Sequence, residues 1–123
     1  MSCIFCVIPK QRIILINKYA YAIMDGFPIT PLHTLIIPKR HIADYFDLSK
    51  DELLGCYAML KEIKKNIQSK DLTIGGFNIG INSGISAGQT ILHCHIHLIP
   101  RRTGDVDNPR GGIRHMIPEK GFY

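Results

Sequence analysis

The stretch TILHCHIHLIP, residues 90–100, carries histidines at positions 93, 95 and 97, although the whole chain of 123 residues holds only six. Successive side chains of a β-strand point to opposite faces, so a strand over this stretch would present the three imidazoles on one face. The other face would carry the apolar set Leu92, Cys94, Ile96 and Leu98. We therefore predict that the apolar set packs on a helix and that the imidazoles face a functional site.

The rest of the chain predicts an antiparallel sheet and one long helix. Short apolar runs suited to strands lie at residues 11–17, in a run that ends at Asp25, and at residues 33–38 and 75–82. Ser49 and Glu52 form a capping box, and apolar residues then recur at helical spacing to about Gln68. The recurring positions are Leu53, Tyr57, Leu60, Ile63 and Ile67. Strands, one helix and strands again predict an α+β domain.

The composition indicates one globular domain over residues 1–123. A chain of this size buries a core without disulfides, and four unevenly spaced cysteines favour reduced thiols or a metal site. The sequence has no run near the ~20 apolar residues of a membrane helix and no signal-peptide pattern, so we expect a cytoplasmic protein. The net charge of +5 favours anionic partners. The arginines after the histidines are the part of this charge that hints at function: Arg101, Arg102, Arg110 and Arg114.

Three imidazoles beside a glycine-rich turn suit attack on a phosphorus centre. Imidazole can act as a nucleophile, as an acid or base near neutral pH, or as a hydrogen-bond donor to phosphate. The turn NSGISAGQT, residues 82–90, can aim backbone N–H groups at phosphate oxygens, and it lacks the lysine of a P-loop. The alternative is that alternate strand positions are simply polar and exposed. Three histidines in phase beside Gly88 and Gln89 favour a site.

Several stretches resemble the histidine triad (HIT) superfamily of nucleotide hydrolases and transferases. They are AGQTILHCHIHLIPR (87–101), CIFCVI (3–8), YAIMDGFPITPLHTLIIPKRHI (21–42) and NIGINSGISAGQT (78–90). The resemblance is to bacterial-type members, and it covers nearly the whole chain. It implies a HIT-like fold, with an antiparallel sheet of about five strands, one long helix and one short helix.

The resemblance also implies roles for individual residues. His95 would attack the α-phosphorus of a nucleotide, and His97 would hold and polarise the phosphate. Other phosphate contacts would come from Asn82, Gly88, Gln89 and Thr90. Asp25 would bind the ribose hydroxyls, Phe5, Ile8 and Met24 would line the base pocket, and His33 would lie near the site. Read singly, Asp25 could be a turn residue, Phe5, Ile8 and Met24 plain core, and Asn82 a strand cap.

Cys3 and Cys6 form a C-x-x-C pair, for which two buried thiols or a metal site are both open readings. A structural zinc site needs four ligands. In the zinc-bearing branch that this chain resembles, the remaining ligands correspond to His41 and His93. The resemblance thus implies a structural zinc and no organic cofactor.

The predicted function is release or transfer of AMP from a dinucleoside polyphosphate such as Ap4A or from an adenosine phosphoramidate, through a nucleotidyl-histidine. The arginines after Pro100 would then meet distal phosphates. The alternative is a purine-nucleotide sensor without turnover. Nucleic-acid binding is not expected, because no aromatic residues interleave with the arginines. The resemblance implies a homodimer, and the sequence indicates no membrane partner.

Overall fold

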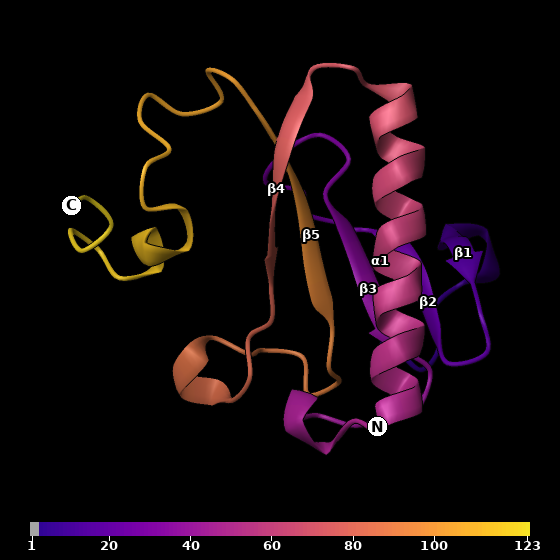
Figure 1. The fold of residues 1–123 in the computed structure, drawn as a ribbon. Coiled ribbons are helices and arrows are strands. Elements are labelled where there is room, and N and C mark those ends of the chain that lie inside the picture. Colours follow the sequence, from indigo (N-terminus) through magenta and orange to yellow (C-terminus); the bar gives the residue numbers. More distant parts are fainter. Residues whose placement is uncertain (1–2) are drawn as a thin grey trace.

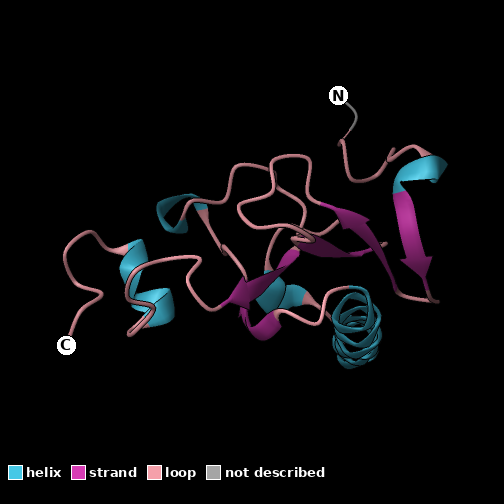
Figure 2. Ribbon diagram, turned by 90° about the horizontal axis from the view of Figure 1, so that it is seen from above, coloured by secondary structure: helices cyan, strands magenta, loops and turns pink. Residues whose placement is uncertain are grey.

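The computed structural model describes residues 3–123 and shows an antiparallel sheet of five strands in the order β1-β2-β3-β5-β4. The strands are β1 (Ile13–Ile16), β2 (Ala20–Met24), β3 (Thr34–Pro38), β4 (Ile74–Gly80) and β5 (Ile96–Arg102). One helix, α1 (Lys50–Lys70), lies along one face of the sheet, and loops lie over the other (Figures 1 and 2). The predicted α+β class and the HIT-like architecture are confirmed.

The short helix that the resemblance implied is not an α-helix within residues 3–123. Short 3-10 turns take its place: η1 (Lys10–Arg12), η2 (Tyr45–Asp47), η3 (Ile85–Ala87) and η4 (Gly112–Met116). The last of these turns belongs to a compact C-terminal segment beside β4 (Figure 1).

The capping box predicted for the long helix is present. The Ser49 side chain accepts from the Glu52 N–H, and the Glu52 carboxylate accepts from the Ser49 N–H. Of the apolar positions predicted at helical spacing, Ile63 and Ile67 are buried and Leu60 packs against the core, but Tyr57 is 58% exposed. The buried positions are Glu52, Cys56, Met59, Ile63 and Ile67. At Gly55 the helix approaches Tyr19 closely, since a Cβ there would lie 2.8 Å from the Cβ of Tyr19.

The strand predicted over residues 90–100 begins later than expected, at Ile96. β5 pairs with β3 only from Ile96 onward, and the Cys94 N–H donates to the Ile42 carbonyl outside the sheet. The three histidines therefore do not form one row on one face. His93 turns toward the N-terminal segment, while His95 and His97 stay together with ring centroids 5.3 Å apart.

Two apolar clusters lie on the two faces of the sheet. The helix-side cluster contains Ile96 and Leu98, as predicted. Leu92 was predicted to join them and is instead 53% exposed, because the chain is not yet in the sheet at that point. Cys94 is buried as predicted, and burial raises the pKa of its thiol to about 11. The opposite cluster is built by Phe5, Tyr21, Ile23, Leu35 and Ile37.

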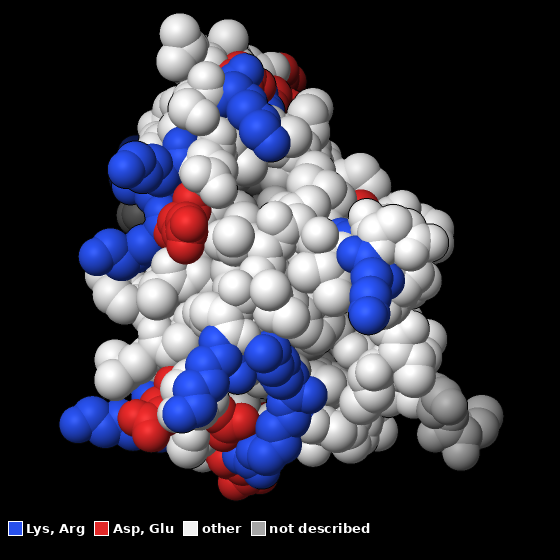
Figure 3. Space-filling model, turned by 90° about the vertical axis from the view of Figure 1, so that its right-hand side faces the viewer, with Lys and Arg blue, Asp and Glu red and all other residues white. Residues whose placement is uncertain are grey.

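Seen from the side of β1, lysine and arginine side chains form separate groups mixed with acidic ones (Figure 3). None of the helices in residues 3–123 combines the length and the apolar character needed to cross a lipid bilayer.

Replacing Glu52 by glutamine should lower the free energy of unfolding by about 1–2 kcal/mol at pH 7, because Glu52 accepts two bonds from the half-exposed Arg40 guanidinium. This guanidinium is the main reason that the pKa of Glu52 falls from 4.5 to about 2. Because the pKa of the Glu52 carboxyl is lower in the folded than in the unfolded chain, its ionised form stabilises the fold at pH values above about 4.5. This stabilisation is lost as the pH falls from about 4.5 toward 2. Urea unfolding of both proteins should therefore show a smaller difference at pH 3 than at pH 7. An equal difference at both pH values would contradict this account.

Candidate active site

A cluster of two thiols and two imidazoles joins the N-terminal segment to the run of histidines. The ligand atoms of Cys3, Cys6, His41 and His93 all lie within 4.8 Å of one another. The His93 Nδ1 lies 3.2 Å from the His41 Nδ1, 3.5 Å from the Cys3 Sγ and 3.6 Å from the Cys6 Sγ. Tetrahedral zinc with ordinary bond lengths gives edges of about 3.3 Å between nitrogens and about 3.6 Å between sulfur and nitrogen. The cluster therefore has the donor set and the spacing of a zinc site.

The orientation of His93 suits a metal ligand and also links the cluster to His95. The fully buried His93 ring donates its Nε2–H to the Pro38 carbonyl, at 2.7 Å, which leaves the Nδ1 lone pair facing the thiols. The His93 carbonyl oxygen lies 2.8 Å from the Nδ1 of His95. A carbonyl only accepts, so the Nδ1 of His95 carries the proton and its Nε2 carries the lone pair.

His95 lines a cavity of about 260 Å³ above the sheet. Its ring is 9% exposed and contacts Phe5 edge-on, with ring centroids 5.0 Å apart. Asp25, Asn82, Gly88, Thr90 and His97 line the same cavity, together with Phe5. Most of the residues that the sequence analysis assigned to the site thus line one cavity.

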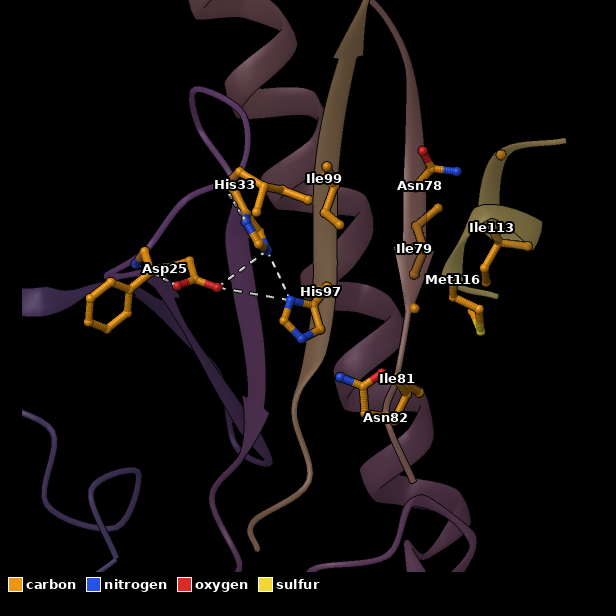
Figure 4. Close-up of a pocket in the computed structure, with 14 residues that line it drawn as sticks. Asp25, His33, Asn78, Ile79, Ile81, Asn82, His97, Ile99, Ile113 and Met116 are labelled. Atoms are coloured by element: carbon orange, nitrogen blue, oxygen red, sulfur yellow. Dashed lines mark hydrogen bonds and ion pairs between the residues drawn. The ribbon is translucent and has the colours of Figure 1, made fainter. Parts of the chain in front are cut away.

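His97 is held by a chain of hydrogen bonds that fixes its tautomer (Figure 4). The Ile29 N–H donates to the Nδ1 of His33, so His33 carries its proton on Nε2. That Nε2 lies 2.9 Å from the Nδ1 of His97 and 3.4 Å from Asp25 Oδ2. His97 accepts at Nδ1 and therefore presents its own Nε2–H. Asp25, His33 and His97 lie close enough to one another to hold a metal. Because the His33 nitrogen that faces His97 carries a proton and has no free lone pair, the arrangement favours a hydrogen-bonded pair of imidazoles over a metal site.

Burial keeps the imidazoles of His33 and His97 neutral. It lowers the pKa of His97 to about 4, with smaller contributions from His95 and His33, against which Asp25 acts. Burial also lowers the pKa of His33, again against Asp25. At neutral pH these rings therefore act as directed hydrogen-bond groups and not as fixed cations.

The glycine-rich turn is shaped differently from the phosphate cradle that the sequence predicted. The N–H groups of Ala87, Gly88 and Gln89 donate to the carbonyls of Gly84 and Ile85, so they are used inside the turn. The buried Gln89 amide accepts from the Gly84 N–H and donates to the carbonyls of Ala43 and Ile91. Gln89 thus holds the turn, and its predicted contact with phosphate stays a prediction. Gly88 lines the cavity with a φ of 91°, a conformation that favours glycine.

A second, larger cavity of about 510 Å³ adjoins the first on the side of β4. Four residues line both cavities and mark the border between them: Asp25, Phe27, Asn82 and His97. The far wall is formed by the C-terminal segment, from which Ile113 and Met116 face Ile79 of β4 (Figure 4). His97 therefore lies at the border between the two cavities, and His95 lines the smaller one.

A family model described as HIT domain matches residues 7–104. The chain belongs to the histidine triad family.

Relatives within the HIT family cover most of this chain. An uncharacterised HIT-like protein of Saccharolobus solfataricus is 36% identical over 98% of this chain and 89% of its own length. A zinc-bound histidine triad family protein from Mycobacterium smegmatis superposes with a TM-score of 0.76 at 38% identity, over 85% of this chain and 78% of its own. An asymmetrical bis(5'-nucleosyl)-tetraphosphatase of Schizosaccharomyces pombe is 36% identical over 72% of this chain and 48% of its own length.

Two residues predicted for the base pocket lie outside the lining of the smaller cavity. Ile8 packs against the cluster around Phe5, and the Met24 sulfur lies 3.8 Å from the Thr34 hydroxyl, which donates to the Leu32 carbonyl. Asp25 does form the ordinary turn considered as its alternative, since its Oδ1 accepts from the Phe27 N–H, while its Oδ2 faces the histidines. The sequence analysis missed Arg12, which lines the cavity of this HIT domain and donates to the Met24 carbonyl. One arginine beside an apolar run carries no signal of such a role.

Proposed function

We propose that this HIT protein is a nucleotide hydrolase or transferase that forms a covalent nucleotidyl intermediate on His95. The observation that supports this most directly is the hydrogen bond from the His95 Nδ1–H to the His93 carbonyl. It directs a lone pair on Nε2 toward a cavity that also holds Asn82, Thr90 and His97. A neutral, preoriented imidazole is a competent nucleophile toward phosphorus.

The reaction proceeds in two displacements. The His95 Nε2 bonds to the α-phosphorus of an AMP-linked substrate while the bond from phosphorus to the leaving atom breaks. The leaving amine or phosphate keeps the electron pair and takes a proton from water. Water then attacks the phosphorus, the bond to His95 breaks, and AMP and a proton are released. In the intermediate the imidazole is cationic, and the His93 carbonyl stabilises it at Nδ1.

His97 acts on the phosphoryl group from the neighbouring position. Its Nε2–H donates to a phosphate oxygen, and the bond strengthens as negative charge builds up on that oxygen. Asn82 and Thr90 supply an amide and a hydroxyl on the same wall of the cavity. Asp25 Oδ2 accepts from a ribose hydroxyl, and the base lies toward Phe5.

Zinc fits the cluster of Cys3, Cys6, His41 and His93, and we propose that these four residues hold it. When bound, the metal supplies a structural crosslink between the N-terminal segment and the histidine run. Because His93 provides both a donor atom and the carbonyl that orients His95, the cluster fixes the backbone from which the nucleophile projects.

A substrate panel tests the proposal. Adenosine phosphoramidate, adenylyl-lysine and diadenosine tetraphosphate are each offered with and without phosphate, and AMP or ADP release is followed by chromatography. Release of AMP from at least one substrate by the wild type, and not by His95→Ala, supports the proposal. Tight AMP binding with no turnover of any substrate would instead indicate a nucleotide sensor.

Replacing His33 by leucine should lower kcat by about 10- to 100-fold with a smaller change in KM, because His97 loses the donor that sets its tautomer. His33 is a positioning residue, so the conservative variant His33→Gln, which retains a donor, should recover part of the loss. Equal loss in both variants, or loss expressed mainly in KM, would contradict this role.

A further inference from the structure

The two residues that separate Cys3 from Cys6 belong to the wall of the smaller cavity. Both Ile4 and Phe5 line the space of about 260 Å³ in which His95 lies. The Phe5 ring contacts the His95 ring edge-on, with ring centroids 5.0 Å apart. A change in the shape of the turn between the two cysteines therefore reaches the proposed nucleophile directly.

The backbone of this turn suits a disulfide. The Cys6 N–H donates to the Cys3 carbonyl at 3.0 Å, which is the bond that closes a β-turn. A β-turn brings its first and fourth Cα atoms within about 7 Å of each other, and a disulfide spans about 4.4–6.8 Å between Cα atoms. The two Sγ atoms already lie within 4.8 Å of each other. A bond between them therefore requires a local change in the turn and no unfolding.

Access to solvent distinguishes these two thiols from the other two in the chain. Cys6 is exposed and Cys3 is half-buried. Cys56 and Cys94 are each 1% exposed, and burial raises the pKa of their thiols to about 12 and about 11. A small oxidant in solution therefore reaches Cys6 first, and the neighbouring thiol is that of Cys3.

Zinc and a disulfide exclude each other at this turn. Zinc binds cysteine as the thiolate, and the thiolate is also the form that attacks an oxidant. The sulfurs of a disulfide carry no charge and lie about 2.0 Å apart, whereas two sulfurs around tetrahedral zinc lie about 3.8 Å apart. Oxidation would thus remove two of the four zinc ligands. His93 would lose the metal that holds it, and its carbonyl is the group that orients His95.

We propose that Cys3 and Cys6 form a reversible oxidation site, at which a hydroperoxide drives formation of a disulfide, release of zinc and loss of activity. The inference rests on the zinc site and on the role of His95 proposed above. It goes beyond both, because it assigns a chemistry of their own to the two solvent-accessible thiols and links that chemistry to the cavity wall at Ile4 and Phe5.

The oxidation takes place in two steps. The Cys6 thiolate attacks one oxygen of hydrogen peroxide, the O–O bond breaks, and the leaving hydroxide takes a proton from solvent, so that Cys6 becomes a sulfenic acid. The Cys3 thiolate then attacks the Cys6 sulfur, the S–O bond breaks, and the second hydroxide is protonated to water. Two electrons pass from the sulfurs to the peroxide, and the products are one disulfide, two water molecules and free Zn²⁺. A thiol such as glutathione reverses the oxidation by exchange.

The test treats zinc-loaded protein with a small molar excess of hydrogen peroxide and follows three quantities. A colorimetric chelator should detect the release of one Zn²⁺ per chain. Mass spectrometry of the alkylated protein should show a bond between Cys3 and Cys6, with the loss of two hydrogen atoms. Turnover of adenosine phosphoramidate should fall by about tenfold or more, and dithiothreitol with added zinc should restore it.

Two variants separate the proposed pair from the other thiols. Cys56→Ala is the matched control, because its thiol is buried in the helix-side cluster, and this variant should respond to peroxide as the wild type does. Cys3→Ser should stop after the first step, so that dimedone labels a sulfenic acid on Cys6 and no disulfide forms within the chain.

The remaining outcomes overturn the proposal in distinguishable ways. Retention of zinc and of all four thiols, a disulfide between two chains, or conversion to sulfinic acid in place of a disulfide refutes the oxidation site. Formation of the disulfide with turnover within twofold of the untreated protein refutes its link to activity. Protein that takes up no zinc refutes the metal site and this proposal together. Absence of His95-dependent turnover before any oxidation refutes the proposed function, which the zinc and disulfide measurements do not require.

Discussion

Replacing His95 by glycine is expected to lower kcat for AMP release by at least about a thousandfold, because the variant lacks the nucleophile on which the covalent intermediate forms. Affinity for AMP should remain within a few fold, since Phe5, Asp25 and Asn82 still line the cavity. Steady-state kinetics with adenosine phosphoramidate and calorimetric titration with AMP measure the two effects. Free imidazole can enter the space left by the ring, and it should restore part of the turnover.

His115→Ala provides the control for the loss of an imidazole. His115 is exposed in the C-terminal segment and lines neither cavity of the site. Its removal should leave turnover of unsubstituted adenosine phosphoramidate within about twofold. Turnover by His95→Gly within tenfold of the wild type would show that the nucleophile lies elsewhere.

Replacing Cys6 by serine is expected to remove a ligand from the zinc site and to weaken zinc binding by at least about a hundredfold. The Cys6 Sγ lies 3.3 Å from the His41 Nδ1 and 3.6 Å from the His93 Nδ1, so no other thiol can take its place without moving the segment. Wild-type protein should carry one zinc per chain by elemental analysis. The variant, or wild type treated with a chelator, should unfold at a lower temperature because bound metal stabilises only the folded state.

Cys56→Ala separates zinc loss from the general effect of losing a thiol. Cys56 is buried in the helix-side cluster, where burial raises the pKa of its thiol to about 12. This variant should lose some packing energy and keep its full zinc content. Wild-type protein that neither contains zinc nor takes it up would contradict the site, as would Cys6→Ser protein with a full complement of zinc.

The activity of Cys6→Ser should also fall, although less than that of the His95 variants. The His93 carbonyl orients the nucleophile, and a less firmly held His93 places that carbonyl less precisely. Zinc thus contributes to activity through position, and no step of the proposed reaction takes place on the metal.

Local signals in the sequence predicted the elements that depend on neighbouring residues. The capping box at Ser49 and Glu52 located the start of α1, because both bonds lie within one turn. The helical spacing did not predict that Tyr57 is exposed, because contacts between residues far apart in the sequence, such as that of Gly55 with Tyr19, leave no local pattern. The late start of β5 has a similar cause, because His93 turns toward Cys3 and Cys6 at the other end of the chain.

Much of the candidate site could be predicted from residue types and the family resemblance. The structure brings together the four proposed zinc ligands and places His95 and His97 beside Asp25. It also shows that Gln89 holds the turn, because its side-chain amide bonds to backbone groups of Gly84 and Ala43. No sequence motif predicts these backbone partners. The larger cavity could not be predicted, because its wall joins β4 to a C-terminal segment without a recognisable pattern.

The proposed nucleophile can be observed most directly by mass spectrometry of protein quenched in acid-free denaturant during turnover. The account predicts a peptide containing residue 95 that carries one adenylyl group on the Nε2 of His95, formed with adenosine phosphoramidate and lost on further incubation. The same peptide should be unmodified in His95→Gly protein. An adenylyl group on His97 or another residue, or rapid AMP release with no adduct on trapping in the millisecond range, would contradict covalent catalysis by His95.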